Sequence, residues 1–315
     1  MVEIPEAKTK TEQILIVTGM DWGICQVLKF IPQWRKRFDV VCAYVLDAFM
    51  HQTPRHRSVS RFSSLIGTLD HVFIPMTACA EAYQKAFEIP VSFIPYACNV
   101  IEFGSNSCSR PIDVIGYGRQ HTQHSQIISD EYNTLYSDRL YYFTSHMNIA
   151  TVNDFYAHRS LFWKILQRSQ IALSYDPLTT NPDRFPFSFI TQRWFECLTA
   201  GCLIVGNRPN CPEANKLLNW QDSTVEMPAD HDSVIPFLED LLSDKERLNA
   251  AHQRNYLHCL ASHDWCHRIA EILDYLNLDY PPSLQRALES LNEMYVRSQR
   301  ISHYSNLAVP PLTKR

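Results

Sequence analysis

The sequence predicts an α/β protein built from parallel sheets. Short apolar runs alternate with segments of helical period along the whole chain, and no repeat of fixed period interrupts this alternation. Strands and helices that alternate in this way form right-handed βαβ units, whose strands run parallel. The 315 residues are enough for two domains, and a non-periodic stretch rich in Asn, Ser and Gly lies between two such halves. We therefore divide the chain into a first domain over 1–100, a linker over 101–110, a second domain over 111–280, and a final helix with a loose tail over 281–315.

The first domain is predicted to hold four strands. Apolar runs predict strands over 13–19, 39–47, 70–75 and 91–95, and helical period predicts helices over 24–38, 58–66 and 77–87. Pro32 should kink or split the first helix. Asp21 and Asp47 each follow a strand, so we expect both carboxylates at the same edge of this sheet. The polar loop 48–57, with two histidines and two arginines, is either a ligand loop or a solvated one.

The second domain opens with a strand over 111–118. Strands are then predicted over 139–144, 171–175 and 202–206, and helices over 125–136, 152–169, 191–200, 214–220, 233–242, 244–260 and 266–276. The final helix, which follows this domain, is predicted over 283–296. The helix over 191–200 carries Trp194, Cys197 and Leu198 on one side, and Gly201 ends it. Ligands of open parallel sheets bind beyond the carboxyl ends of the strands, where the loop from Asn207 would lie. A second interpretation stays open, in which Arg193 and Glu196 form only a solvated surface ion pair.

The end of the first strand of this domain favours phosphate binding. Gly116 and Gly118 precede Arg119 there. Glycines let a backbone approach a phosphate, and a guanidinium binds phosphate through two donors. A plain turn with one surface arginine remains the alternative.

Composition excludes several classes. A formal net charge of -4 argues against a general nucleic-acid binder. Ten cysteines without a C-x-x-C pair favour reduced thiols in the cytoplasm, and no apolar run has the length of a signal peptide core or of a membrane span. His263 and His267 lie four apart, but a metal site needs more ligands, so no metal is predicted. The basic cluster 34–38 leaves peripheral membrane contact as a minor possibility.

A family resemblance covers most of 110–275 and, more weakly, 13–100. Residues 193–202, Arg-Trp-Phe-Glu-Cys-Leu-Thr-Ala-Gly-Cys, resemble the Arg-x-Phe-Glu-x-x-x-x-Gly-x segment of family-one-like glycosyltransferases of GT-B fold. The resemblance continues through Pro212-Glu213, the helical stretch 234–242 and the stretch 262–268. It implies two Rossmann-like domains facing a cleft, with a final helix that crosses back to the first domain. At about 100 residues, the first domain is short for this family.

The resemblance also implies roles for individual residues. Glu196 would bind the ribose of a nucleotide-sugar donor, Gly201 would let the chain approach the nucleotide, and Arg119 would bind the diphosphate. No lysine follows Arg119, so His121 or His124 would have to assist. A second glutamate of many relatives is replaced by Ser188. The full set of expected donor-binding residues is Gly118, Arg119, Thr191, Arg193, Glu196, Gly201 and Asn207, and the expected catalytic residues are Asp21, Asp47, Arg119 and Glu196.

These observations predict a glycosyltransferase that moves a sugar from a nucleotide-sugar donor to an unknown acceptor, which is a glycan, a lipid or a small molecule. No metal or other cofactor is expected, because helix N-termini and basic side chains can take the charge of the leaving diphosphate. Asp21, Asp47 or a histidine of 51–56 would be the base of an inverting reaction. The short first domain motivates an alternative, a non-catalytic GT-B-like module that binds a nucleotide or a protein. Another two-domain α/β enzyme, such as an epimerase or phosphorylase, is a third possibility.

Overall fold

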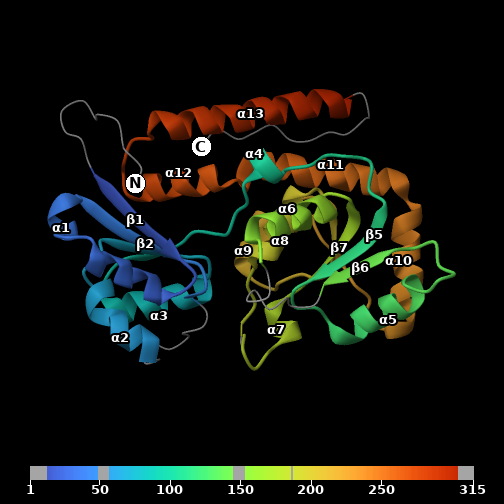
Figure 1. Cartoon of the computed structure of the whole chain (residues 1–315), viewed down its shortest axis with the longest axis horizontal. Coiled ribbons are helices and arrows are strands. Elements are labelled where there is room, and N and C mark those ends of the chain that lie inside the picture. Colours follow the sequence, from blue (N-terminus) through green and yellow to red (C-terminus); the bar gives the residue numbers. More distant parts are fainter. Residues whose placement is uncertain (1–12, 49–56, 145–152, 186, 304–315) are drawn as a thin grey trace. The chain divides into compact units, whose positions relative to one another are not determined.

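The computed structural model describes residues 13–48, 57–144, 153–185 and 187–303 (Figure 1). Contacts divide the chain into two units. The first comprises Met1–Tyr96 and Cys266–Glu289, and the second comprises Ala97–Trp265 and Ser290–Arg315. Each unit contains one parallel sheet. Residues 49–56 of the predicted loop 48–57 and most of the predicted tail lie outside the described residues.

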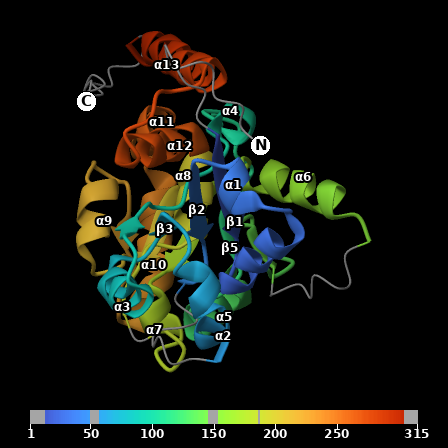
Figure 2. The ribbon, with the colours of Figure 1, turned by 90° about the vertical axis from the view of Figure 1, so that its left-hand side faces the viewer.

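The first unit is built on a four-stranded parallel sheet in the order β1-β2-β3-β4. Its strands are β1 (Ile14–Gly19), β2 (Val40–Val45), β3 (His71–Ile74) and β4 (Val91–Phe93). Its helices are the 3-10 helix η1 (Trp22–Phe30), α1 (Trp34–Arg37), α2 (Arg57–Ile66) and α3 (Thr77–Phe87). The expected break at Pro32 is confirmed, because η1 ends before it and α1 begins after it. Figure 2 shows β1, β2 and β3 from the side.

The strand order of this sheet explains the return of the chain to the first unit. Right-handed crossovers between strands in the order 1-2-3-4 place every crossover helix on one face. The other face is covered by α12 (Trp265–Tyr275) and the start of α13 (Pro282–His303). Ala270 and Leu273 of α12 pack with Ile14, and Tyr275 contacts Phe73 at 5.9 Å between ring centroids. The predicted boundary of the second domain at residue 280 is therefore corrected to Trp265.

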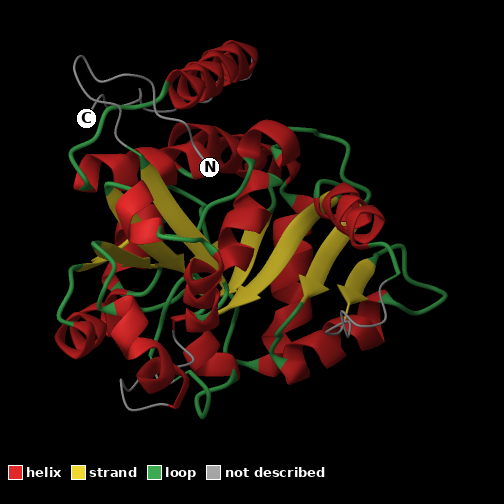
Figure 3. Cartoon of the chain, turned by 60° about the vertical axis from the view of Figure 1, so that its left-hand side comes forward, coloured by secondary structure: helices red, strands yellow, loops and turns green. Residues whose placement is uncertain are grey.

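The second unit is built on a five-stranded parallel sheet in the order β6-β5-β7-β8-β9. Figure 3 shows the strands of the chain in yellow and the helices in red. Its strands are β5 (Ile112–Tyr117), β6 (Tyr141–Thr144), β7 (Ser169–Tyr175), β8 (Leu203–Asn207) and β9 (Val225–Glu226). Its helices are α4 (Val100–Phe103), α5 (Thr122–Tyr132), α6 (Phe155–Leu166), α7 (Pro177–Thr180), α8 (Gln192–Thr199), α9 (Pro212–Leu217), η4 (His231–Ser233), α10 (Val234–Ser243) and α11 (Lys245–Ser262).

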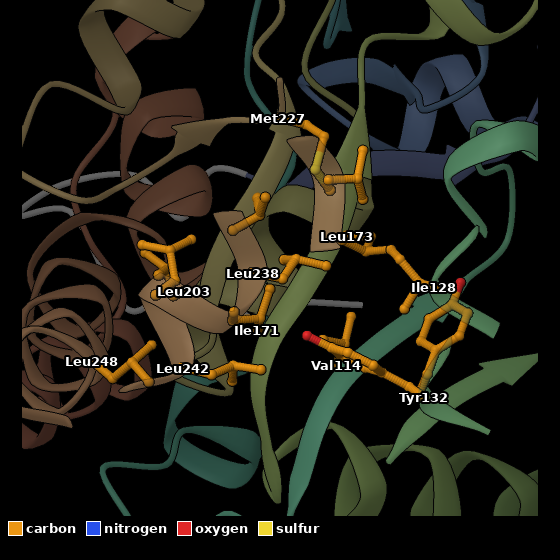
Figure 4. Close-up of a cluster of buried hydrophobic side chains, with 14 of the residues drawn as sticks. Val114, Ile128, Tyr132, Ile171, Leu173, Leu203, Met227, Leu238, Leu242 and Leu248 are labelled. Carbon is orange, nitrogen blue, oxygen red and sulfur yellow. The ribbon is translucent and has the colours of Figure 1, made fainter. Parts of the chain in front are cut away.

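Side chains alternate across this sheet and form a core on each face. Val114, Ile171 and Leu203 point to the face that α5 and α10 cover, where they join a large apolar cluster (Figure 4). Tyr117 and Ser174 belong to the opposite set of positions. They contact α6 and α8 through the Phe162 ring, 4.9 Å from that of Tyr117, and through Cys197. Helices thus cover both faces, as in a doubly wound fold.

Candidate active site

The strand order of the second sheet defines a topological switch point. From β5 the chain crosses to β6 on one side and then to β7 on the other, so the helices that follow β5 and β7 lie on opposite faces. Open α/β sheets bind ligands in the crevice outside the carboxyl ends of two such strands. The turns that begin at Gly118 and Asp176 flank this point.

The turn after β5 contains a glycine in a left-handed conformation. Gly118 has φ +65°, a left-handed conformation that favours glycine. Arg119 follows, with its guanidinium carbon 4.6 Å from the centroid of the buried Phe185 ring. The side-chain amide of Gln120 donates to Tyr117 O at 2.9 Å and to Leu173 O at 3.2 Å, which ties the turn to β7. The structure thus places Gly118 and Arg119 together at the switch point.

Arg193 supports this turn from the first part of α8. Its Nη1 donates to Arg119 O at 2.5 Å, and its guanidinium carbon lies 5.2 Å from the centroid of the Tyr117 ring. A Cβ on Gly118 would lie 2.1 Å from Arg193 Nη2, so a side chain at this position would require the Arg193 guanidinium to move. The interpretation of Arg193 and Glu196 as a solvated ion pair is wrong, because the carboxylate of Glu196 pairs with a different arginine.

Glu196 is buried, with 6 % of its surface exposed, on the face of the sheet that α6 covers. Its Oε1 accepts from Arg159 of α6, and its Oε2 accepts from the Tyr117 hydroxyl at 3.2 Å. Burial raises the pKa of Tyr117 well above its ordinary value, so this hydroxyl remains a donor. Arg159 was not predicted as a site residue. The only sequence signal was its position in a predicted helix with a strongly aromatic sequence.

The turn after β7 is fixed by a second set of polar contacts. Asp176 is buried and accepts from the Ser188 hydroxyl and from Leu178 N at 3.1 Å. Its own N–H donates to Asn207 O at 2.8 Å, and Asn207 Oδ1 accepts from Thr179 at 2.6 Å. Asn207 thus lies at the carboxyl edge, as expected. The bond from the Ser188 hydroxyl thus helps to hold the Asp176 carboxylate in place.

Thr191 and Gly201 lie at the two ends of α8. Thr191 precedes the helix as its N-cap residue, without a side-chain capping bond. Gly201 has φ +78°, and a Cβ there would lie 2.5 Å from Ser105 O and 2.7 Å from Arg110 Nη2. These protein contacts explain the glycine at the amino end of β8, which is the edge opposite the switch point. The expected contact between Gly201 and a nucleotide stays a prediction.

Asp21 and Asp47 belong to the first unit. Gly19 pairs with Val45, so the two carboxylates follow neighbouring parallel strands at one edge of that sheet. Asp21 caps η1 by accepting from Gly23 N at 2.7 Å. The Tyr96 hydroxyl donates to Leu46 O at 2.6 Å and lies 3.5 Å from Asp47 Oδ1. The shared edge is as predicted, and the catalytic role of either residue is untested.

His263 is buried, and its Nε2 lies 3.1 Å from Leu217 O. Within the described ranges, no group of three or more His, Cys, Asp or Glu side chains is arranged to hold a metal ion. Among these same residues, no helix is both long enough and apolar enough to span a membrane.

Two α/β units, each with one parallel sheet, are the architecture of GT-B glycosyltransferases. The model of one family, described as "Glycosyl transferase-like", matches residues 108–274, more than half of the chain. The chain therefore belongs to this glycosyltransferase family. Among curated protein sequences none matches it.

Solved structures share the fold at low sequence identity. Anabaena HepE, determined with UDP and glucose, has a TM-score of 0.53 and 8% identity, covering 83% of this chain and 77% of that chain. An E. coli trehalose-6-phosphate protein bound with UDP-2-fluoro glucose has a TM-score of 0.53 and 11% identity, and the match covers 86% of this chain and 74% of that chain. A UDP-forming α,α-trehalose-phosphate synthase from Burkholderia vietnamiensis has a TM-score of 0.51 and 9% identity, and the match covers 89% of this chain and 73% of that chain.

Proposed function

We propose that this glycosyltransferase binds its nucleotide-sugar donor at the switch point between β5 and β7 and transfers the sugar to a hydroxyl-bearing glycan, lipid or small molecule. The proposal rests on the turn at Gly118 and Arg119, which Arg193 stabilises by donating to Arg119 O. A left-handed glycine followed by an arginine, at the carboxyl edge and before an eleven-residue helix, suits an anionic diphosphate.

The proposed roles follow from the positions of the side chains. Arg119 and the first backbone N–H groups of α5 would take the charge that develops on the leaving diphosphate, so the reaction needs no metal. The carboxylate of Glu196 accepts two hydrogen bonds in this structure, and a carboxylate has about four acceptor positions, which leaves capacity for ribose hydroxyls. Asp21 or Asp47 would be the base if the reaction inverts configuration.

The relatives suggest which donor to test first. The structures of HepE and of the E. coli protein contain UDP or a UDP-sugar. A uridine diphosphate sugar is therefore our first candidate donor, although these low identities alone show only the fold.

We further propose a cytoplasmic location, since burial raises the pKa of thiols such as Cys25 and Cys202 to about 11 and protects them as reduced core residues.

Contact with an anionic membrane is a second proposal. The exposed Phe30 lies four residues before α1, in which Lys36 and Arg37 are exposed.

Thermal unfolding tests the donor site. Purified protein is screened against UDP, GDP, ADP and their sugar conjugates, and a ligand at a hundred times its dissociation constant should add about 2.7 kcal/mol to stability. The screen is repeated on Glu196→Gln, which keeps the length of the side chain. The matched control is Glu239→Gln, which removes a different Arg–Glu pair of the second unit, that with Arg139.

We expect one nucleotide family to stabilise the wild type and the control, and to stabilise Glu196→Gln much less. Release of nucleotide from the selected sugar conjugate, with and without acceptor mixtures, then separates a transferase from a non-catalytic binding module. If no nucleotide stabilises the wild type, the proposed donor site is wrong.

A further inference from the structure

Three histidines from two elements gather beside the proposed donor site. His121 and His124 lie at the start of α5, and His231 lies in η4. Their ring centroids are separated by 4.1 Å for His121 and His124, 5.5 Å for His124 and His231, and 6.1 Å for His121 and His231. His121 follows Arg119 by two residues, so the cluster continues the turn that flanks the switch point.

Hydrogen bonds fix which nitrogen atoms of the cluster are occupied. His121 Nδ1 accepts from His124 N at 3.4 Å and caps α5, so the proton of a neutral His121 ring is on Nε2. His124 Nδ1 lies 3.1 Å from the hydroxyl of Tyr175, the last residue of β7. Burial raises the pKa of that hydroxyl, so Tyr175 stays protonated and can donate. The neutral His121 ring therefore carries an Nε2–H donor, and His124 carries one as well in the tautomer in which Tyr175 donates.

One carboxylate, that of Asp230, interacts with this cluster: its bonds from Ser233 and from Asp232 N, together with the nearby His231, lower its pKa. Within the described residues, none of the three histidines lies within ion-pair distance of an Asp or Glu oxygen. Asp230 and Asp232 flank His231, but Asp230 accepts from Ser233 Oγ at 2.7 Å and from Asp232 N at 3.4 Å. The other titratable groups packed against α5 are tyrosines and the Arg139–Glu239 pair: Tyr141 of β6 bonds Ser125, and Glu239 of α10 is held by Arg139.

Two rings of the free cluster have a pKa below the ordinary value of histidine. Burial, together with the neighbouring imidazoles His121 and His231, lowers the pKa of His124 to about 4, and burial and His231 lower that of His121. A bound dianion would remove the repulsion between protonated rings and favour their charged form, because opposite charges within a few ångströms raise a histidine pKa.

We infer that His121, His124 and His231 form a phosphate-type anion subsite whose occupation takes up a proton from solution. The identification of its ligand as the donor diphosphate rests on the proposed function, whereas the anion subsite itself does not. At this position the cluster takes the place of a permanently charged lysine. Donor affinity would therefore rise as the pH falls, about tenfold between pH 7.5 and pH 5.5 for partial uptake of one proton.

Sulfate is the first probe, because it stays doubly charged over this pH range. Proton and carbon NMR spectra of protein with labelled histidine rings are titrated with pH, with and without sodium sulfate. We expect sulfate to raise the pKa of at least one ring of the cluster. His121→Asn, which keeps a capping acceptor for α5, and His231→Gln identify the signals. His71→Gln in the first unit is the control, since His71 bonds Ser92 and lies in the other sheet.

Calorimetry with the nucleotide sugar selected by the thermal screen is the second arm. Binding enthalpies measured in two buffers of different ionisation enthalpy give the number of protons taken up. We expect uptake in the wild type and in His71→Gln, and its loss in His121→Asn combined with His231→Gln. Nucleotide-sugar binding without proton uptake, together with sulfate-insensitive rings, overturns this inference and leaves the proposed function intact. If sulfate raises the pKa of these rings but the protein binds no nucleotide, the anion subsite is supported and the proposed function is overturned.

Discussion

Gly118 has a left-handed backbone conformation and lies close to the Arg193 guanidinium, and substitution by alanine tests both features. Gly118→Ala places a Cβ against Arg193 Nη2 and keeps a residue with a side chain at φ +65°. We expect a loss of about 1 to 3 kcal/mol in the free energy of unfolding, and weaker donor binding because Arg119 shifts. Urea unfolding and donor titration measure the two effects. Adding Arg193→Ala should recover only the part caused by the steric clash, and a fully stable Gly118→Ala would contradict this account.

Arg159 and Glu196 form the pair that links α6 to α8. Arg159→Met leaves a carboxylate that is 6 % exposed without its cation, so we expect a loss of about 1 to 3 kcal/mol in the free energy of unfolding. Glu196→Gln combined with Arg159→Met should lose less than the two single variants added together. The double-mutant cycle from urea unfolding checks this coupling. Additive losses would show that the pair does not stabilise the fold.

At the scale of elements, α11 contains a histidine that makes stability depend on pH. Burial and the nearby Arg110 lower the pKa of His252 to about 3, below its ordinary value of 6.5. Between these two values the unfolded chain binds a proton that the folded chain does not bind. Stability should therefore fall as the pH decreases from 6.5 towards 3, by up to about 1.4 kcal/mol per pH unit from this residue.

His252→Gln is the variant for this pH dependence, because a glutamine amide can still donate to Gln170 O, which lies 3.0 Å from His252 Nε2. Urea unfolding at several pH values should give a shallower acid loss for the variant than for the wild type. Parallel curves for the two proteins would exclude His252 as a source of the acid sensitivity.

The order of elements was predictable from the sequence because apolar period and glycine stops are local signals. The helix over 191–200 corresponds to α8, and Gly201 ends it as expected. The 3-10 character of η1, the short helices α4 and α7, and the two-residue strand β9 were missed, because they have too few residues to show a period. The assignment of α12 to the first unit was also missed, since it depends on which face of a distant sheet lacks cover.

The candidate site was predictable only in part, for the same reason. Gly118, Arg119 and Asn207 follow strands, so their place at the carboxyl edge follows from the topology alone. The partners of Glu196 and Arg193 could not be read from the sequence, because Arg159 and Arg119 are 37 and 74 residues away from them along the chain. The histidine cluster likewise needs η4, which the sequence did not reveal.

At the scale of the whole molecule, the two units predict a separation between donor binding and transfer. The residues proposed to bind the donor all belong to the second unit, whereas Asp21 and Asp47 belong to the first. We expect Asp21→Asn and Asp47→Asn to keep donor affinity within about twofold. If either residue is the general base, its variant should slow transfer by about 10²- to 10⁴-fold. Asparagine can still cap η1 at position 21, so the local fold is kept.

Asp39→Asn is the matched control for this separation. Asp39 is a carboxylate of the same unit that precedes β2, at the amino edge of the sheet, where its Oδ2 accepts from Gln13 N at 3.0 Å. Calorimetric titration gives donor affinity, and release of nucleotide in the presence of acceptor gives the rate. A loss of donor affinity in Asp21→Asn or Asp47→Asn, with Asp39→Asn unchanged, would place the donor in contact with the first unit. Equal rates in all three variants would exclude both aspartates as the base and favour a retaining reaction, which needs no such group.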